Sequence, residues 1–242
     1  MRVSRLYVNA ALNAGGCIEL DDDAAHYVRS VLRLKAGDAI VLFNGLGGEY
    51  ASRFSEVSRK NVRVEIEAFS ARDVESPLRV CLGMGISRGD RMDWAVQKAV
   101  ELGVAELTPL LTERCVTKLN DDKKQQRWQH WHGIVRHAAE QSGRTCLPLL
   151  GNIAELSDWV ERPRGLKVFL DPYAELTLAD LQPSDSQITL LSGPEGGFSD
   201  AERQIAKAAG FVPVRMGARI LRTETAVLSA LSAVQTLWGD FR

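Results

Sequence analysis

The sequence is poor in cysteine, and its cysteines do not form a metal-binding or redox motif. The four of them are Cys17, Cys81, Cys115 and Cys146. They are scattered singly, so no Cys-x-x-Cys pair is present to start a zinc site or a redox centre. Four unpaired thiols are typical of a reducing compartment, and they predict a cytoplasmic protein.

Long apolar runs are also missing. A helix that crosses a bilayer needs about 20 apolar residues, and the longest uncharged stretch, 225–239, is interrupted by serine, glutamine and threonine. That stretch also lies at the wrong end of the chain to be a signal peptide. The sequence therefore predicts no membrane segment.

An excess of charge of one sign is absent as well. The 242 residues include 30 Lys and Arg and 31 Asp and Glu, which gives a net charge of -1. Bulk charge thus does not indicate a nucleic-acid partner, which would have to be held by local patches. Hydrophobic residues at 45% and charged residues at 25% are average for globular proteins and argue against fibrous, low-complexity and membrane classes. A chain of this length forms one large domain or two small ones.

The first seventy residues are dense in short alternating runs. The patterns predict strands over 39–43, 50–57 and 61–67, with Asn44-Gly45 and Gly47-Gly48 in a hairpin turn. The spacing becomes helical between 20 and 35. We expect a small β-barrel that carries one helix. The polar stretch 70–77 then indicates a domain boundary, which we place after residue 72.

The remainder of the chain alternates between strand and helix patterns. A strand over 78–85, a helix around 92–102 and a strand over 105–111 form a β-α-β unit, which predicts a parallel sheet. Further helices are predicted over 123–142, 153–160, 199–209 and 223–238, and further strands over 166–170, 187–191 and 211–215. The second domain is therefore expected to be of the α/β class.

One segment at the end of a predicted strand is rich in glycine. The strand 187–191 runs into Gly193-Pro194-Glu195-Gly196-Gly197, and Ser199 with Glu202 forms a capping box that opens the next helix. Ligands bind at this edge of open α/β sheets, where glycines let the backbone approach a bound group. The alternative is a tight turn without a ligand. A carboxylate at Glu195 suits a ribose hydroxyl or an amine better than a phosphate.

The familiar nucleotide-binding motifs are absent from the sequence. No Gly-x-x-x-x-Gly-Lys-Ser/Thr is present, and Gly83-Met84-Gly85 is followed by Arg88 where a dinucleotide motif has its third glycine. The sequence thus supports neither a P-loop nor an ordinary dinucleotide fold.

A second segment, 216–230, joins a strand to the last helix. Thr223 or Thr225 is expected to cap that helix, whose apolar stripe is Val227, Leu231, Val234 and Trp238. The preceding loop holds Arg219 and Arg222, with Glu224 directly after it. Charges crowded into so short a loop either pair with one another or face a site.

Together, the two segments resemble the SPOUT methyltransferases, most closely the ribosomal RNA small-subunit methyltransferase E (RsmE) group. Further matches follow in order along nearly the whole chain: 5–7, 26–38, 76–78, 87–89, 97–104, 112–115 and 140–144. One departure is Ala218, where members often carry proline.

The resemblance implies a fold and a reaction. Residues 1–72 would form a PUA-like β-barrel that binds RNA. Residues 73–242 would form a SPOUT α/β domain with a deep trefoil knot, which binds S-adenosylmethionine and forms a homodimer. The implied reaction is methylation of N3 of a uridine in 16S ribosomal RNA. The cofactor pocket would consist of Leu170, Ser192, Gly193, Pro194, Glu195, Gly196, Gly197 and the loop Met216, Gly217, Ala218, Arg219, Ile220, Leu221, Arg222 and Thr223.

The reaction restricts the roles of the charged residues. The uracil N3 proton has a pKa near that of tyrosine, on the order of 10, and must be lost as the methyl group arrives. Arg219 or Arg222 would stabilise the uracil anion. Glu140 and Glu224 are both possible bases, and the choice between them stays open. Glu140 is counted with Arg219 and Arg222 among the expected catalytic residues. Glu195 is assigned to cofactor binding or to structure.

Arginines are expected to form the RNA surface, because the guanidinium fork suits phosphate. The candidates are Arg5, Arg29, Arg33, Arg88, Arg91 and Arg144. Arg29 and Arg33 lie one α-helical turn apart and would form a small phosphate clamp. The alternative for each is a solvated surface charge.

The histidines on the helix predicted over 123–142 do not indicate a metal site. His130 and His132 point about 200° apart on a helix, and they lie beside two tryptophans in a pattern that is typical of a packed or interfacial helix. We expect no metal. Two rival functions are a SPOUT enzyme with another target, such as tRNA or a ribose 2′-hydroxyl, and a non-catalytic RNA-binding factor of ribosome assembly.

Overall fold

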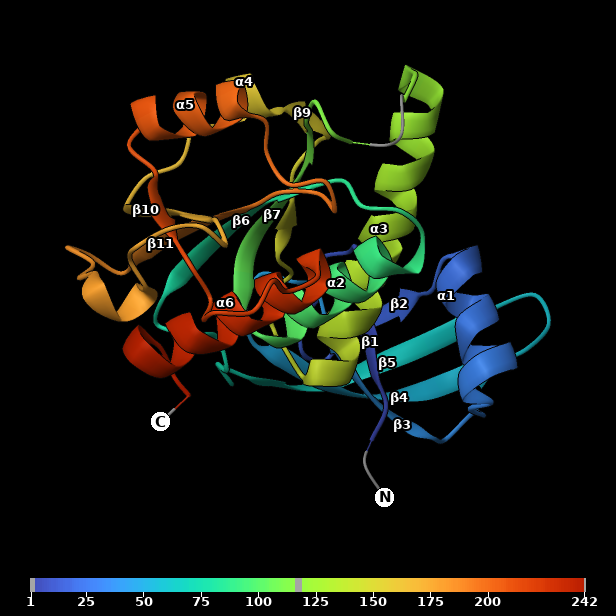
Figure 1. Ribbon diagram of the computed structural model, residues 1–242. Coiled ribbons are helices and arrows are strands. Elements are labelled where there is room, and N and C mark those ends of the chain that lie inside the picture. The colour runs from blue at the N-terminus through green and yellow to red at the C-terminus, as the bar shows by residue number, and fades with distance from the viewer. Residues whose placement is uncertain (1–2, 116–118, 242) are drawn as a thin grey trace. The chain divides into compact units, whose positions relative to one another are not determined.

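The computed structural model describes residues 3–115 and 119–241, and Figure 1 shows the course of the chain. Contacts divide the chain into two compact units. The first comprises Met1–Glu75 and Ala139–Leu147, and the second comprises Ser76–Ala138 and Pro148–Arg242. The division between them lies three residues beyond the expected boundary. The expected second domain also included 139–147, which packs with the first unit.

The first unit contains a five-stranded sheet among its described residues, with strand order β1-β3-β4-β5-β2. The strands are β1 (Arg5–Tyr7), β2 (Cys17–Glu19), β3 (Ala39–Phe43), β4 (Glu49–Val57) and β5 (Val62–Ser70). The strand expected over 61–67 is confirmed, and it is half-buried, because Val62, Val64 and Ile66 are buried while the residues between them are exposed. Strands β1 and β2 were not predicted, since three residues are too few to establish alternation.

The helix of the first unit is shorter than its sequence pattern indicates. Helix α1 (Asp22–Tyr27) is capped by the Asp21 side chain and continues as one π-helical turn, η1 (Val28–Leu32). Arg33 follows with a positive φ of 55° and ends the turn. The predicted phosphate clamp requires Arg29 and Arg33 to share one α-helical face. They do not share one, so the prediction of the clamp is wrong. Arg29 instead donates a hydrogen bond to the carbonyl oxygen of Ser58 at 3.1 Å.

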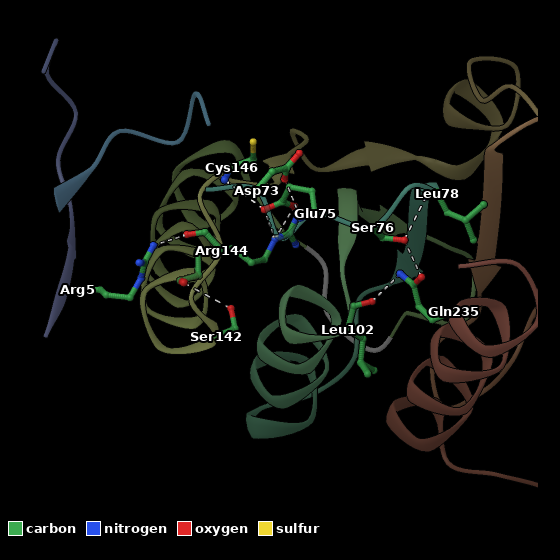
Figure 2. A network of polar contacts seen from close by, with 11 residues as sticks. Arg5, Asp73, Glu75, Ser76, Leu78, Leu102, Ser142, Arg144, Cys146 and Gln235 are labelled. Carbon is green, nitrogen blue, oxygen red and sulfur yellow. Dashed lines mark hydrogen bonds and ion pairs between the residues drawn. The ribbon is translucent and has the colours of Figure 1, made fainter. Parts of the chain in front are cut away.

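Ion pairs and hydrogen bonds tie 139–147 into the first unit. Arg144 forms an ion pair with Glu75, with a 2.9 Å bond from Nε to Oε2 (Figure 2). Arg5 pairs with Glu49 and donates to the carbonyl oxygen of Arg144 at 2.9 Å. The side chains of Arg5 and Arg144 are only 8% and 7% exposed. Both guanidinium groups are thus held inside the unit, where a phosphate contact would require breaking these bonds.

The second unit contains a parallel sheet, as the β-α-β pattern predicted. Among the described residues it has seven strands in the order β12-β10-β11-β6-β7-β8, with β9 also paired to β7. Every pairing in this sheet is parallel. The strands are β6 (Arg79–Gly85), β7 (Val104–Leu111), β8 (Leu149–Leu150), β9 (Ala154–Glu155), β10 (Leu166–Leu170), β11 (Gln187–Ser192) and β12 (Val212–Val214).

Helices cover this sheet and contribute to its core. They are α2 (Asp90–Glu101), α3 (Asp121–Ser142), α4 (Leu156–Trp159), η2 (Leu178–Asp180), α5 (Asp200–Ala208) and α6 (Thr223–Trp238). Helices α2 and α6 lie side by side in Figure 1 and pack against each other. The ring of Trp159 on α4 packs directly against Gly83 in β6, where a side chain would collide with it. Among the described helices, none is long and apolar enough to span a membrane.

A stacked ring pair on α3 generates a prediction about pH. Trp128 and His132 stack with ring centroids 4.9 Å apart. Burial, and then the charge of Arg136, lower the pKa of His132 from its usual 6.5. As the pH falls through about 6.5, His132 is protonated in the unfolded chain before it is protonated in the folded protein. The free energy of unfolding therefore decreases in this pH range.

We expect His132→Phe to keep the stacking and to remove this pH dependence. The free energy of unfolding, measured by urea denaturation, should fall less in the variant than in the wild type between about pH 7 and about pH 5. An equal fall in both proteins would contradict this account of His132.

Candidate functional site

The glycine-rich loop lies at the carboxyl edge of the sheet, directly after β11. The predicted capping box is confirmed, because the backbone N–H of Ser199 donates to Glu202 Oε2 at 2.8 Å and that of Glu202 donates to Ser199 Oγ. The same carboxylate accepts a 2.8 Å bond from the backbone N–H of Glu113, which follows β7. The start of α5 is thereby fixed to the end of a neighbouring strand.

Close packing explains two of the glycines in and around the loop, and a positive φ explains a third. A Cβ on Gly85, the last residue of β6, would lie 2.6 Å from the backbone nitrogen of Pro194. One on Gly196 would lie 3.1 Å from Cβ of Arg114, whose guanidinium donates to the Gly196 carbonyl at 3.0 Å. Gly197 has a φ of +65°, a conformation that favours glycine. The loop is thus packed against the ends of β6 and β7.

Glu195 joins this loop to the start of α2. Its Oε1 accepts hydrogen bonds from the backbone N–H of Arg88 at 3.0 Å and from Nη1 of Arg91 at 3.3 Å. The carboxylate is 24% exposed. The expected bond to a ribose hydroxyl or an amine stays a prediction, whereas the bonds to Arg88 and Arg91 hold the loop in place.

The second loop, 216–223, leads from the end of β12 into the first residue of α6. The N-cap of α6 is Arg222, and no side chain forms a capping hydrogen bond there. The prediction that Thr223 or Thr225 caps the helix is therefore wrong, because both residues already lie within it. Val227, Leu231 and Val234 are buried as the stripe predicted, while Trp238 is half-buried. Gln235, also fully buried, bonds to Ser76 and to the Leu102 carbonyl (Figure 2).

The two loops enclose a hollow of about 520 Å³, here called the first hollow. It contains the whole predicted pocket apart from Gly217 and Ala218: Leu170, Ser192, Gly193, Pro194, Glu195, Gly196, Gly197, Met216, Arg219, Ile220, Leu221, Arg222 and Thr223. Gly217 has a φ of +80° and shapes the turn of the second loop. The structure thus brings together two segments, 192–197 and 216–223, that are well separated in the sequence.

Several lining residues of the first hollow were not predicted. Asp171 and Tyr173 follow the carboxyl end of β10, and Asp171 forms an ion pair with Arg203. Tyr173 is 76% exposed and donates its backbone N–H to Asp171 at 3.0 Å. Their position after a parallel strand is the signal that could have identified them, because ligands bind at that edge.

A second hollow of about 790 Å³ adjoins the first and shares Arg91 and Arg222 with it. Its other lining residues come from α2, α3 and the start of α6: Asp90, Asp93, Trp94, Gln97, Ile134, Glu224 and Thr225. Trp94 is 46% exposed there.

The remaining predicted site residues lie elsewhere. Glu140 belongs to the first unit, where its Oε1 accepts a 2.9 Å bond from the backbone N–H of Tyr7, and it does not line either hollow. Arg5 and Arg144 are in the same unit and are buried in ion pairs. Arg88 and Arg91 are exposed beside Glu195. The second unit therefore gathers Arg91, Arg219 and Arg222 around the hollows.

The histidine-rich helix is packed through an acidic residue. Asp93 on α2 contacts His130 Nε2 at 2.7 Å and accepts a 3.0 Å bond from Trp131 Nε1. Among residues 3–115 and 119–241, no group of three or more His, Cys, Asp and Glu side chains is placed to hold a metal ion.

Two family models match the chain. An RNA methyltransferase domain matches residues 74–235, and an RNA methyltransferase PUA domain matches residues 20–67. The first covers the parallel sheet with both loops of the first hollow, and the second lies within the first unit.

Relatives and solved structures match over almost the full length. Ribosomal RNA small subunit methyltransferase E of Buchnera aphidicola subsp. Schizaphis graminum is 34% identical over 99% of this chain and 98% of its own. The Neisseria gonorrhoeae protein of that name, solved with S-adenosylmethionine, has a TM-score of 0.93 and 36% identity over 100% of both chains. A Legionella pneumophila protein described as a methyltransferase, solved with the same cofactor, has a TM-score of 0.96 and 38% identity over 100% of both chains.

The parallel sheet, the two loops at its carboxyl edge and these full-length similarities agree with one another. The chain belongs to the ribosomal RNA small subunit methyltransferase E family of SPOUT-class RNA methyltransferases.

Proposed function

We propose that this protein transfers the methyl group of S-adenosylmethionine to N3 of a uridine in 16S ribosomal RNA. The observation that carries the proposal is the first hollow. In a chain of this family, it joins the glycine-rich loop 193–197 to the arginine-bearing loop 216–223 at the carboxyl edge of a parallel sheet. Ligands of open α/β sheets bind at this edge.

The residues of the first hollow fit S-adenosylmethionine. The volume of about 520 Å³ is within the range of about 300–1,000 Å³ that is usual for small-molecule pockets. Leu170, Pro172 and Ile220 supply apolar surface for an adenine ring, and the glycines leave the backbone of 193–197 accessible to polar groups. Bound there, S-adenosylmethionine would supply an electrophilic methyl group on a positively charged sulfur.

The charges around the hollow suit this transfer. A free carboxylate placed against the sulfur would stabilise the ground state more than the transition state. Glu195 is instead bonded to Arg91 and to the Arg88 backbone. Arg219 and Arg222 are exposed at the hollow, where they would stabilise the uracil anion that forms when N3 loses its proton.

The other expected properties extend the proposal. The first unit would bind RNA as a PUA-like domain, and the second would bind the methyl donor and form a homodimer in which the partner completes the site. The deep trefoil knot and the dimer stay predictions. Of the six arginines expected to contact RNA, the exposed Arg88 and Arg91 remain candidates, whereas Arg5 and Arg144 have structural bonds. The site of action would be the small ribosomal subunit in the cytoplasm.

The direct test uses labelled S-adenosylmethionine and small ribosomal subunits from a strain that lacks the enzyme. Mass spectrometry of the digested RNA should find the label in 3-methyluridine. Label in another nucleoside would show that the target is wrong. Cofactor binding without any transfer would instead support a binding-only assembly factor.

Arg222→Ala is expected to reduce methyl transfer without affecting the fold. Arg222 is exposed, so its removal leaves no buried group unpaired. Loss of one group that stabilises a developing anion typically reduces kcat by about 10²–10³-fold. The measurement is the single-turnover rate on small subunits, with circular dichroism as the control for folding. Normal turnover would refute the role of Arg222.

Gly196→Trp is expected to abolish S-adenosylmethionine binding, because Gly196 lines the hollow and already lies against Arg114. Calorimetric titration measures the affinity, and filter binding of small subunits checks that RNA binding is retained. An active Gly196→Trp variant would show that the pocket is assigned to the wrong loop.

Gly85→Ala tests whether the packing of β6 positions the glycine-rich loop. The new Cβ would lie 2.6 Å from the backbone nitrogen of Pro194, so the loop must shift. We expect a loss of stability of about 1–3 kcal/mol, typical of overpacking, together with weaker S-adenosylmethionine binding by calorimetry. Gly133→Ala is the matched control, since its Cβ meets nothing within 4 Å. Equal affinity in both variants would contradict the proposed dependence.

A further inference from the structure

The second hollow lies where a methyl acceptor would have to bind. It adjoins the first hollow and shares Arg91 and Arg222 with it. Its lining is formed where α2 and the start of α6 pack side by side (Figure 1). A group bound there would approach the first hollow past these two arginines. Transfer requires donor and acceptor to be held next to each other.

Glu224 lines this hollow and has an unpaired carboxylate oxygen. Its Oε2 is buried and has no hydrogen-bond partner among the residues that the structure describes. A buried acceptor without a donor is costly, unless an incoming ligand supplies the donor. The first turn of α6 favours a negative charge at this position. The missing partner is therefore a hydrogen-bond donor, of which an N–H is the simplest.

Trp94 supplies the aromatic surface of the same hollow. It is 46% exposed on α2, and its neighbours in the lining are mostly charged or polar: Asp90, Arg91, Asp93 and Gln97. A lone aromatic ring in a polar hollow is suited to a flat, polar ligand. Nucleobases stack on such rings, whatever their sequence, because each base has a π-face.

We propose that the second hollow binds the target uracil, which stacks on Trp94 while Glu224 accepts the N3 proton. This inference rests on the proposed function. The Watson–Crick edge of uracil presents a donor, N3–H, between two acceptors, O2 and O4. Glu224 lines the same hollow as the guanidinium donors Arg91 and Arg222, so the hollow holds one acceptor and two sets of donors, the complementary kinds of group. Cytosine presents an acceptor at N3, so in the same orientation it would place a lone pair, and not an N–H, against the Glu224 carboxylate.

The same placement accounts for the proton. As N3 forms its bond to the methyl carbon, the N3 proton passes to the Glu224 carboxylate. The electron pair of the broken methyl–sulfur bond stays on the sulfur, which becomes a neutral thioether. The protonated Glu224 then releases its proton to water through the open side of the hollow. Arg222 stabilises the negative charge that develops on the uracil oxygens.

Binding of the nucleotide alone provides a test that does not depend on turnover. Saturation-transfer NMR with uridine monophosphate and cytidine monophosphate should show a preference for uridine of about tenfold in the wild type. Glu224→Gln should lose this preference. Trp94→Ala should weaken the binding of both nucleotides by about tenfold, and Trp94→Phe should retain it.

Methyl transfer to small subunits tests the role of Glu224 in proton transfer. Glu224→Gln should reduce the single-turnover rate by about 10²–10⁴-fold, the usual range for general-base catalysis. Its S-adenosylmethionine affinity should be unchanged. Asp200→Asn is the matched control, because Asp200 is an exposed acid in the first turn of α5 and lines neither hollow.

Substrate substitution separates a base from a merely structural residue. Small subunits reconstituted on 16S RNA made with 5-fluorouridine carry a more acidic N3 proton. Glu224→Gln should be impaired much less on this substrate than on ordinary subunits. An equal deficit on both substrates, with normal S-adenosylmethionine binding, would overturn the proton-acceptor role.

Two further outcomes would overturn the proposal as a whole. A wild type that forms 3-methyluridine, combined with a fully active Glu224→Gln, would leave the proposed function intact and refute this site. If Trp94→Ala changes the oligomeric state in sedimentation while nucleotide binding is retained, a second copy of the chain occupies the hollow. Absence of 3-methyluridine from the wild-type reaction would instead identify the proposed function as the failure.

Discussion

The carboxylate of Glu195 is the contact on which the geometry of the site depends. It joins the loop 193–197 to the first turn of α2, through the Arg88 backbone and the Arg91 guanidinium. Arg91 in turn lines both hollows. One side chain therefore fixes the relation between the loop that would hold the donor and an arginine that faces the acceptor. Methyl transfer by alignment requires the donor and the acceptor to be held in a fixed relation, and a positively charged side chain fixed in advance stabilises the charge that develops.

Other contacts hold the loop from different sides. Gly85 admits Pro194 against the end of β6, Arg114 bonds to the Gly196 carbonyl, and Glu202 binds the backbone of Glu113 after β7. Each tether reaches the carboxyl end of a parallel strand. The loop is thus supported by the rigid part of the second unit, although it carries glycines that are intrinsically flexible.

The sequence predicted best those elements that rest on local signals. The strands 39–43 and 166–170 and the helix 223–238 have the expected bounds, and the Ser199–Glu202 capping box forms as expected. These features depend on alternation, on helical spacing and on a side chain that bonds three residues away. The family resemblance, carried by the paired C-terminal motifs, implied the residues that line the first hollow. The structure brings these residues together because loops that follow parallel strands meet at one edge of the sheet.

Features that depend on distant partners were not predictable in the same way. The sequence indicated Arg5 and Arg144 as candidate RNA contacts, but in the structure they form ion pairs with Glu49 and Glu75. Glu140 bonds to the backbone of Tyr7, which is 133 residues away. The π-helical turn at Val28–Leu32 changes the direction of Arg33 in a manner that no α-helical spacing indicates. In each case tertiary structure determines which partner the side chain or backbone contacts. A local sequence pattern contains no information about such a distant partner.

The central claim is that the methyl donor binds between the loops 193–197 and 216–223. A crystal structure with S-adenosylhomocysteine, the product of the donor, tests this most directly. The account predicts density for the ligand in the first hollow, against Leu170 and the glycine-rich loop, with its sulfur facing Arg222 and the second hollow. Density for the ligand at any other place on the second unit would contradict it.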